Sequence, residues 1–170
     1  YGPLITTALT EDVRYDLDDW IPIVQIEEGH NVFFVRSDSP IRNVSDWVEM
    51  AKADPGSITI AHGRYLAPPH LPLILFEEKA GIKNTHVATT GGSEARAFVS
   101  GGQVDMGASV TTSILPMVEA GEYRAIAVPI AERSPIMADV PTLLEEGYDV
   151  VLPFWFMVFA HKSTPEADRK

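Results

Sequence analysis

Apolar and polar positions along the middle of the chain follow two alternating patterns. Short apolar runs, typical of buried strands, are separated by stretches in which apolar residues recur every three or four positions, which is typical of amphipathic helices. The pattern predicts strands at 31–35, 57–61, 85–88, 103–108 and 123–128, and helices at 44–53, 69–80, 93–100 and 112–120. This regular alternation predicts an α/β layer with a mostly parallel sheet.

Glycine, proline and short polar side chains mark the ends of the expected helices. We expect Ser45 to cap the helix 44–53 and Asp54-Pro55-Gly56 to stop it. Gly81 and Gly121 follow two other helices at the position where a left-handed residue commonly ends one. These signals place the helix boundaries independently of the apolar pattern.

The two flanks of the chain are less regular. Residues 1–28 carry apolar runs and an acidic turn at 16–19. Prolines interrupt the chain after Arg133, a helix-sized piece is expected at 142–146, and an apolar strand is expected at 154–160.

The charge of the chain excludes several classes of partner. The formal net charge is −11, and the basic residues are scattered. Nucleic acid is therefore not an expected partner, because phosphate contacts need clustered Lys and Arg. The longest apolar block, 150–160, is interrupted by Pro153 and is shorter than the roughly 18 residues of a membrane span. We expect no direct membrane insertion, and any anion must be bound by local donors rather than by the overall field.

A glycine-rich turn is the strongest local candidate for such donors. Gly91, Gly92 and Ser93 lie between the expected strand 85–88 and the helix that follows. The first turn of a helix has unpaired N–H groups and a positive dipole end, and glycine lets a ligand approach closely. The turn can therefore bind a phosphate or a carboxylate. The alternative is that the glycines only shape the turn and Ser93 only caps the helix.

Two further loops are expected at the same edge of the sheet, where α/β proteins bind ligands. In the loop at 62–69, Arg64 could clamp a carboxylate, His62 could donate a hydrogen bond, and Gly63 lies between them. Hydroxyl side chains at the other two loops are those of Thr89, Thr90, Ser109, Thr111 and Thr112. They could complete a polar cup, although each taken alone is more often a turn or cap residue than a ligand contact.

Motifs for catalysis and for cofactors are absent from the sequence. It holds no cysteine, no P-loop, no GxGxxG after a strand and no GxSxG nucleophile elbow. His62 and His70 could meet across their loop, but a metal would need a third ligand that the spacing does not identify, so we expect no metal and no cofactor. Asp105 near His86 is the best acid–base pair, although Asp105 is more simply explained as fixing the end of a strand.

Several segments, in order along nearly the whole chain, match the pattern of a known receptor family. They are DWIPI at 19–23, VATTGGS at 87–93, GGQVD at 101–105, AGEYRAIAV at 120–128, ERSP at 132–135 and DVPTLLEEG at 139–147. With these segments the chain resembles the extracytoplasmic solute receptors of tripartite tricarboxylate transporters, the Bug receptors. The last three segments are the most specific.

The resemblance implies a type II periplasmic-binding-protein architecture with two lobes and a cleft between them. It implies that residues 1–30 are a remnant of an incomplete first lobe, 31–129 are a complete second lobe, and 130–170 return to the first. It further implies a periplasmic receptor without catalysis. Such a receptor captures a small carboxylate, often a dicarboxylate, through amides, hydroxyls and water, and delivers it to the membrane subunits of the transporter.

Two loops depart from the family pattern. The loop that usually reads SSG-x-GSSSHL is here AHGRYLAPPHL at 61–71, and the usual Pro-Tyr-Lys is Ala88-Thr89-Thr90. The first change puts bulky and basic groups in place of small hydroxyls, and the second removes a bulky wall. The ligand class is thus less certain than the fold. Two other functions also stay open: an α/β enzyme acting on a small anionic substrate, and a sensor or scaffold lobe used without transport.

Overall fold

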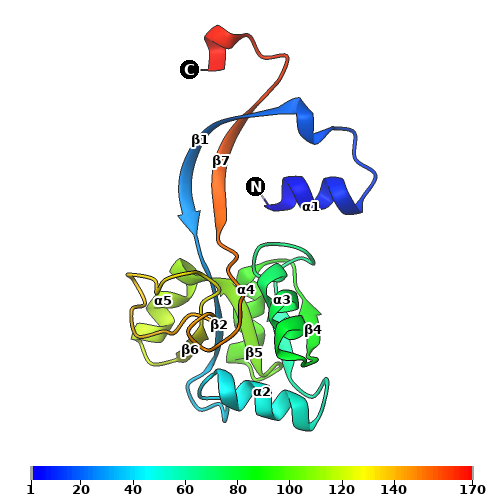
Figure 1. The fold of residues 1–170 in the computed structure, drawn as a ribbon. Helices are drawn as coiled ribbons and strands as arrows, with labels where there is room; N and C mark the ends of the chain where they lie inside the picture. Colours follow the sequence, from blue (N-terminus) through cyan, green and yellow to red (C-terminus); the bar gives the residue numbers. More distant parts are fainter. Residues whose placement is uncertain (1, 170) are drawn as a thin grey trace.

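The computed structural model describes the backbone of residues 2–169 and the side chains of 4–169. Its elements in chain order are α1 (Gly2–Thr10), η1 (Leu17–Asp19), β1 (Trp20–Gly29), β2 (Asn31–Arg36), α2 (Val44–Ala53), β3 (Thr59–His62), α3 (Leu71–Ala80), β4 (Thr85–Ala88), α4 (Gly92–Ser100), β5 (Met106–Val110), α5 (Thr111–Glu119), β6 (Tyr123–Ala127), β7 (Phe154–His161) and η2 (Glu166–Arg169). They form a layered α/β body and a separate two-stranded ribbon that stands above it (Figure 1).

The body is built on a five-stranded sheet with the order β4-β3-β5-β2-β6. Strand β3 pairs in parallel with β4 and β5, whereas β2 is antiparallel to both β5 and β6. All strands of this sheet except β2 therefore run in one direction. The α/β class is confirmed, but the expected mostly parallel order holds only for this sheet, because the ribbon strands β1 and β7 are antiparallel.

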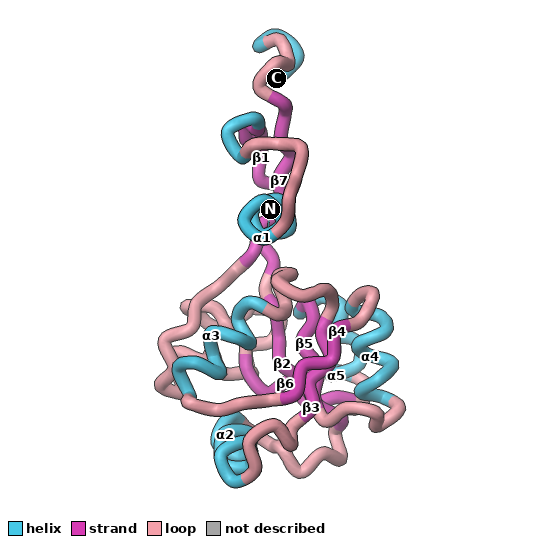
Figure 2. Tube along the Cα trace, turned by 90° about the vertical axis from the view of Figure 1, so that its right-hand side faces the viewer, coloured by secondary structure: helices cyan, strands magenta, loops and turns pink. Residues whose placement is uncertain are grey.

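Helices cover both faces of the sheet, and the alternation of side chains along β2 shows why. Phe33 and Val35 point to one face and pack with α2 and α3, while Val32 and Phe34 point to the other and pack with α4 and α5. Figure 2 shows α2 and α3 on the opposite side of the sheet from α4 and α5. A strand buried on both faces needs apolar residues at every position. The unbroken apolar run at 32–35 therefore fits a strand in a sheet that is covered by helices on both faces.

Most element boundaries agree with the sequence prediction, with corrections to one helix cap and to four elements. Helix α2 spans the expected residues, but Asn43 caps it by accepting from the Asp46 N–H, in place of Ser45. Strand β5 begins at Met106, because the chain from Gly101 first closes the end of α4, with the Gln103 N–H donating to the Phe98 carbonyl. In addition, β3 begins at Thr59 rather than at 57, and α3 begins at Leu71 rather than at 69. The expected helix at 142–146 is only a hydrogen-bonded turn.

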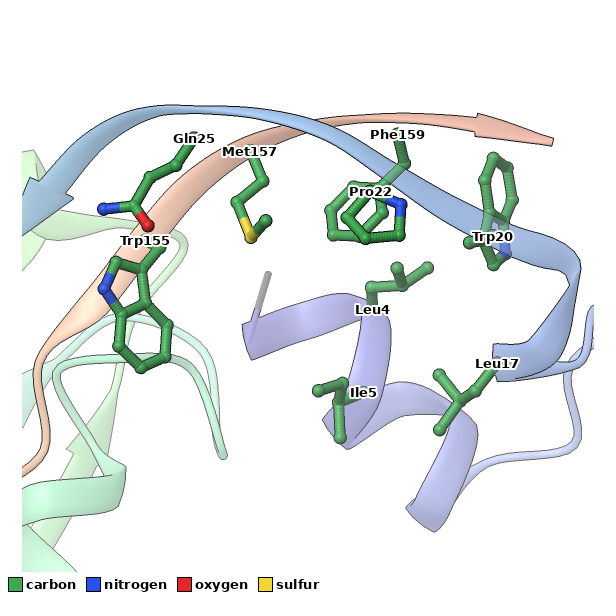
Figure 3. Close-up of a pocket in the computed structure, with 9 residues that line it drawn as sticks. All are labelled: Leu4, Ile5, Leu17, Trp20, Pro22, Gln25, Trp155, Met157 and Phe159. Atoms are coloured by element: carbon green, nitrogen blue, oxygen red, sulfur yellow. The ribbon is translucent and has the colours of Figure 1, made fainter. Parts of the chain in front are cut away.

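The ribbon joins the two flanks of the chain. Strand β1 pairs with β7 from Trp20 opposite His161 to Gly29 opposite Phe154. Helix α1 lies beside it and leaves an apolar hollow of about 460 Å³ (Figure 3). Its lining residues are Leu4, Ile5, Leu17, Trp20, Pro22, Gln25, Trp155, Met157 and Phe159. A hollow with this lining offers no charged partner to an anion.

Residues 130–150 stay with the α/β body before the chain returns to the ribbon. Ile130, Met137 and Val140 are buried with the α4 and α5 side of the core, and Leu143 and Val150 are buried with the α2 and α3 side. The division into lobes remains a prediction, and this packing moves the proposed return from residue 130 to the stretch after Val150.

Candidate functional site

The carboxyl ends of β3, β4 and β5 lie at one edge of the sheet, because these strands are parallel neighbours. Thr89, just after β4, ties two of the three loops together. Its N–H donates to the His62 carbonyl at 2.9 Å, and its hydroxyl lies 2.8 Å from the same oxygen and 2.9 Å from the Gly91 carbonyl. Thr89 is buried, and its hydroxyl joins the loop after β3 to the turn before α4.

The first turn of α4 presents unpaired backbone donors at this edge. Gly91 is the N-cap and makes no side-chain capping bond. Within residues 2–169, the N–H groups of Gly92, Ser93 and Glu94 have no protein acceptor. Ser93 is not the cap considered from the sequence, since its hydroxyl accepts from the Arg96 guanidinium at 3.1 Å. These three N–H groups can bind an anion.

The third loop approaches the same turn through Ser109. A Cβ built on Gly92 would lie 3.1 Å from the Ser109 hydroxyl, and one built on Gly63 would lie 4.0 Å from the Gly91 Cα. The structure therefore brings His62, Gly63, Thr89, Thr90, Gly91, Gly92, Ser93 and Ser109 to one region. Thr111 is different: its N–H and hydroxyl both donate to the His30 carbonyl at 2.9 Å, and it is buried.

An open cavity of about 740 Å³ lies over this edge. It is lined by Glu11, Arg64, Tyr65, Ala88, Thr89, Thr90 and Glu94. Arg64 is exposed, and its guanidinium has no hydrogen-bond or ion-pair partner within the described residues. Sequence reasoning missed Tyr65, Glu94 and Glu11; for Glu11 no local signal exists, because it is brought here by the position of α1.

Glu94 places a carboxylate beside the donors of α4. It accepts from the Thr90 N–H at 2.7 Å and from the Thr90 hydroxyl at 2.8 Å. These two bonds stabilise the ionised form and lower the pKa of Glu94. The spacing Thr90-to-Glu94 was the available sequence signal, since a Glu in the first turn of a helix often reaches back to the residues before it. The cavity therefore combines an unpaired cation with a fixed anion.

Three imidazoles cluster beneath the loop that carries Arg64. His62 stacks on His70 with ring centroids 4.1 Å apart, which confirms that the two residues meet. His70 Nε2 lies 3.0 Å from His86 Nδ1, and one nitrogen from each of the three residues lies within 4.8 Å of the others. His86 is thus the third side chain that the spacing did not identify. Burial lowers the pKa of His62 and lowers that of His70 to about 3.

Asp105 does not take part in this cluster. Its carboxylate accepts from the Thr59 N–H at 2.8 Å and from the Thr59 hydroxyl at 2.6 Å, so it fixes the start of β3, as the simpler explanation required. His86 instead contacts the Glu77 carboxylate at 2.9 and 3.0 Å. The acid–base pair considered from the sequence is therefore not assembled.

Comparison with known proteins identifies the family. The family model described as tripartite tricarboxylate transporter family receptor matches residues 4–168. The chain belongs to this receptor family. A curated relative, the UPF0065 protein in the tcbD-tcbE intergenic region of Pseudomonas sp. (strain P51), is 31% identical over 160 residues, which are 91% of this chain and 47% of that protein. This receptor chain therefore spans about half the length of the relative.

Solved structures agree with the assignment and confirm the periplasmic-binding-protein-like fold. R. palustris Rpa4515 with adipate is 27% identical, with a TM-score of 0.83 over 91% of this chain and 52% of that one. MatC from Rhodopseudomonas palustris with bound malate has a TM-score of 0.85 over 96% of this chain and 56% of that one. At 23% identity the second structure supports the fold alone. No helix in the described part of this receptor is long and apolar enough to cross a membrane.

Proposed function

We propose that this receptor captures a small organic acid, a dicarboxylate or a related carboxylate, and delivers it to the membrane subunits of a tripartite transporter. The family of the chain supports the receptor role and a periplasmic location. The relative with adipate supports a carboxylate ligand, because it is a dicarboxylate complex of a protein with this fold.

One observation carries the proposal. The unpaired N–H groups of Gly92 and Ser93 and the unpaired Arg64 guanidinium lie on loops at the same edge of the sheet, near one open cavity. Helix N-termini and guanidinium groups both favour carboxylates over neutral ligands. A chain with a net charge of −11 needs such local donors, because its overall field repels anions.

The ribbon suggests how binding is communicated. Strands β1 and β7 are the connections that leave the α/β body (Figure 1). In the proposed two-lobe arrangement, residues 31 to about 150 form one lobe, and the ribbon leads to the other. A ligand held by both lobes stabilises a closed form only to the extent that it binds that form more tightly, and the transporter then recognises it.

The site favours a protein that binds its ligand without catalysis over an α/β enzyme. Within the described residues, Asp105 is engaged with Thr59, and His86 is engaged with Glu77 and His70. Within residues 2–169, the hydroxyls of Thr89 and Thr90 in the cavity donate to other groups and make no hydrogen bond to His70 or His86. The hydroxyl that does meet a base in this cavity is that of Thr90, which donates to the Glu94 carboxylate, and the lowered pKa of Glu94 makes it a weak general base for activating a hydroxyl.

The test is a thermal-shift titration of the full-length protein, as encoded, with mono-, di- and tricarboxylates and amino acids. A ligand that binds only the folded state at a hundredfold excess over Kd stabilises it by about 2.7 kcal/mol. Arg64→Gln is expected to lower the affinity for the carboxylate at least about tenfold. Lys79→Gln, which removes an exposed charge on α3, should leave the affinity unchanged.

A shift with one chain length of dicarboxylate supports the receptor function and sets the span of the pocket. If no carboxylate shifts the unfolding temperature, the carboxylate assignment is withdrawn and the fold stands. Chromatographic recovery of the ligand after incubation separates binding from turnover, because conversion of the ligand would support the enzyme alternative.

A further inference from the structure

The cluster of His62, His70 and His86 has the composition of a metal centre. Three imidazole nitrogens, one from each residue, lie within 4.8 Å of one another. Three histidines are the protein ligands of zinc sites that keep a fourth position for water or another donor. We propose that these three residues bind a divalent transition-metal ion, with Zn²⁺ as the best match, beneath the loop that carries Arg64.

The hydrogen bonds around the cluster already orient two of its imidazoles as metal ligands are oriented. His62 Nδ1 lies 2.7 Å from the Gly63 carbonyl, so Nδ1 carries the proton and donates it. His86 Nε2 lies 2.9 and 3.0 Å from the two oxygens of Glu77 and donates to that carboxylate. Metal-bound histidines almost always donate their other N–H to a carbonyl or a carboxylate in this manner. The lone pairs are thereby left on His62 Nε2 and His86 Nδ1.

His62 Nε2 is the feature that a purely structural cluster does not explain. Within the described residues it is a buried polar nitrogen without a hydrogen-bond partner, on a side chain that is 0% exposed. A buried polar atom without a partner costs free energy and calls for an explanation. A metal ion would supply that partner.

A nearby carboxylate can also compensate part of the positive charge of the ion. Glu77 lies against His86, and its side chain is only 15% exposed, so its carboxylate can offset part of the charge at short range. It is held in place by Asn84, which donates to Glu77 Oε1 at 2.6 Å and accepts from the indole N–H of the buried Trp47 at 3.1 Å. The carboxylate is therefore positioned by the core of the body rather than by solvent.

His70 is the ligand whose proton must move from one ring nitrogen to the other when a metal binds. Its Nδ1 accepts from the Leu66 N–H at 2.9 Å, so in the metal-free form Nε2 carries the proton and donates to His86 Nδ1 at 3.0 Å. Binding a metal through Nε2 moves the proton to Nδ1, and the Leu66 N–H then loses its acceptor. Leu66 has φ +57°, a conformation unusual for a residue other than glycine. The metal is therefore expected to shift the turn at 64–67.

Cobalt binding tests the site directly. Chelator-treated full-length protein is titrated with Co²⁺, and the visible absorption of four-coordinate Co²⁺ is followed, after which Zn²⁺ is added as a competitor. We expect one ion per chain and displacement of Co²⁺ by Zn²⁺. His62→Asn, whose amide can still donate to the Gly63 carbonyl, should lose at least about tenfold in affinity, whereas His161→Asn, at an exposed position on β7, should not.

Two further measurements separate a metal site from a structural cluster. Glu77→Gln leaves the three imidazoles in place and keeps an oxygen that can accept from Asn84. It should weaken Zn²⁺ binding about 10- to 100-fold, because it removes the carboxylate behind His86. Zn²⁺ should also speed hydrogen exchange of the Leu66 amide. Absence of the Co²⁺ absorption, or equal affinity of wild type and His62→Asn with both folded by circular dichroism, overturns the proposal. The site does not depend on the proposed carboxylate function.

Discussion

Gly107 of β5 lies directly opposite Phe34 of β2, and the phenyl ring fills the space that a side chain at 107 would need. A Cβ built on Gly107 would lie 2.3 Å from the Phe34 Cζ atom. Phe34 is fully buried and packs against Tyr123 with ring centroids 4.9 Å apart. The ribbon repeats this arrangement, with a Cβ on Gly29 only 2.4 Å from the Phe154 ring.

We predict that Gly107→Ala lowers the free energy of unfolding by about 1–3 kcal/mol, because the added methyl overpacks a buried site. Chemical denaturation measures the change. Gly91→Ala is the control, since a Cβ there meets nothing within 4 Å. A second change, Phe34→Leu in the Gly107→Ala background, should recover part of the loss. No loss in Gly107→Ala would mean that the ring moves aside freely.

Gly92→Val is predicted to weaken ligand binding at least about tenfold, or ~1.4 kcal/mol. A Cβ at this position already lies 3.1 Å from the Ser109 hydroxyl, and the branched side chain would also block approach to the first turn of α4. Isothermal titration of the full-length protein with the ligand found by thermal shift measures the effect. Ala53→Val, at an exposed position at the end of α2, is the control. Unchanged affinity would exclude this turn from the site.

Glu94→Gln is predicted to raise the affinity for a dicarboxylate severalfold, because the ionised carboxylate of Glu94 repels an anion bound in the same cavity. Glutamine keeps an acceptor for the Thr90 N–H and hydroxyl. The gain should shrink at high salt, and Glu78→Gln, an exposed residue on α3, should show none. A fall in affinity would instead indicate that Glu94 meets a cationic group on the ligand.

The buried imidazoles make stability depend on acid. The pKa of His70 is lowered from 6.5 to about 3 by burial, so the unfolded chain binds a proton that the folded chain does not between these two values. This contribution is fully present above pH 6.5 and is lost as pH falls toward 3. Over that range the free energy of unfolding should fall by up to ~1.4 kcal/mol per pH unit for this residue.

Urea denaturation at several pH values checks this dependence. His70→Asn keeps an acceptor for the Leu66 N–H and removes the titrating group, so its stability should depend less steeply on pH than that of the wild type. His161→Asn is the control, because it makes the same replacement at an exposed position on β7. Equal slopes for His70→Asn and wild type would show that His70 is not the group responsible.

Sequence reasoning was most successful where the signal is local. Helix α2 and strand β4 were predicted at their observed bounds, because apolar periodicity and the Asp54-Pro55-Gly56 stop lie within a few residues of each other. The turn at 142–146 shows the limit. Thr142 and Glu145 exchange hydrogen bonds as in a helix start, but Gly147 at φ +89° ends the turn after a single cycle. Competing local signals of this kind are resolved only by packing.

The sequence by itself determined the alternation of strands and helices, the receptor family and the location of candidate residues at strand ends, because these depend on periodicity and short motifs. The tertiary structure decided which distant residues meet. The parallel register that places His86 beside Ile60 brings it to His62 and His70, and the packing of α1 brings Glu11 to Arg64. Such contacts join residues far apart in the chain, and strand pairing and core packing select them without leaving a local pattern in the sequence.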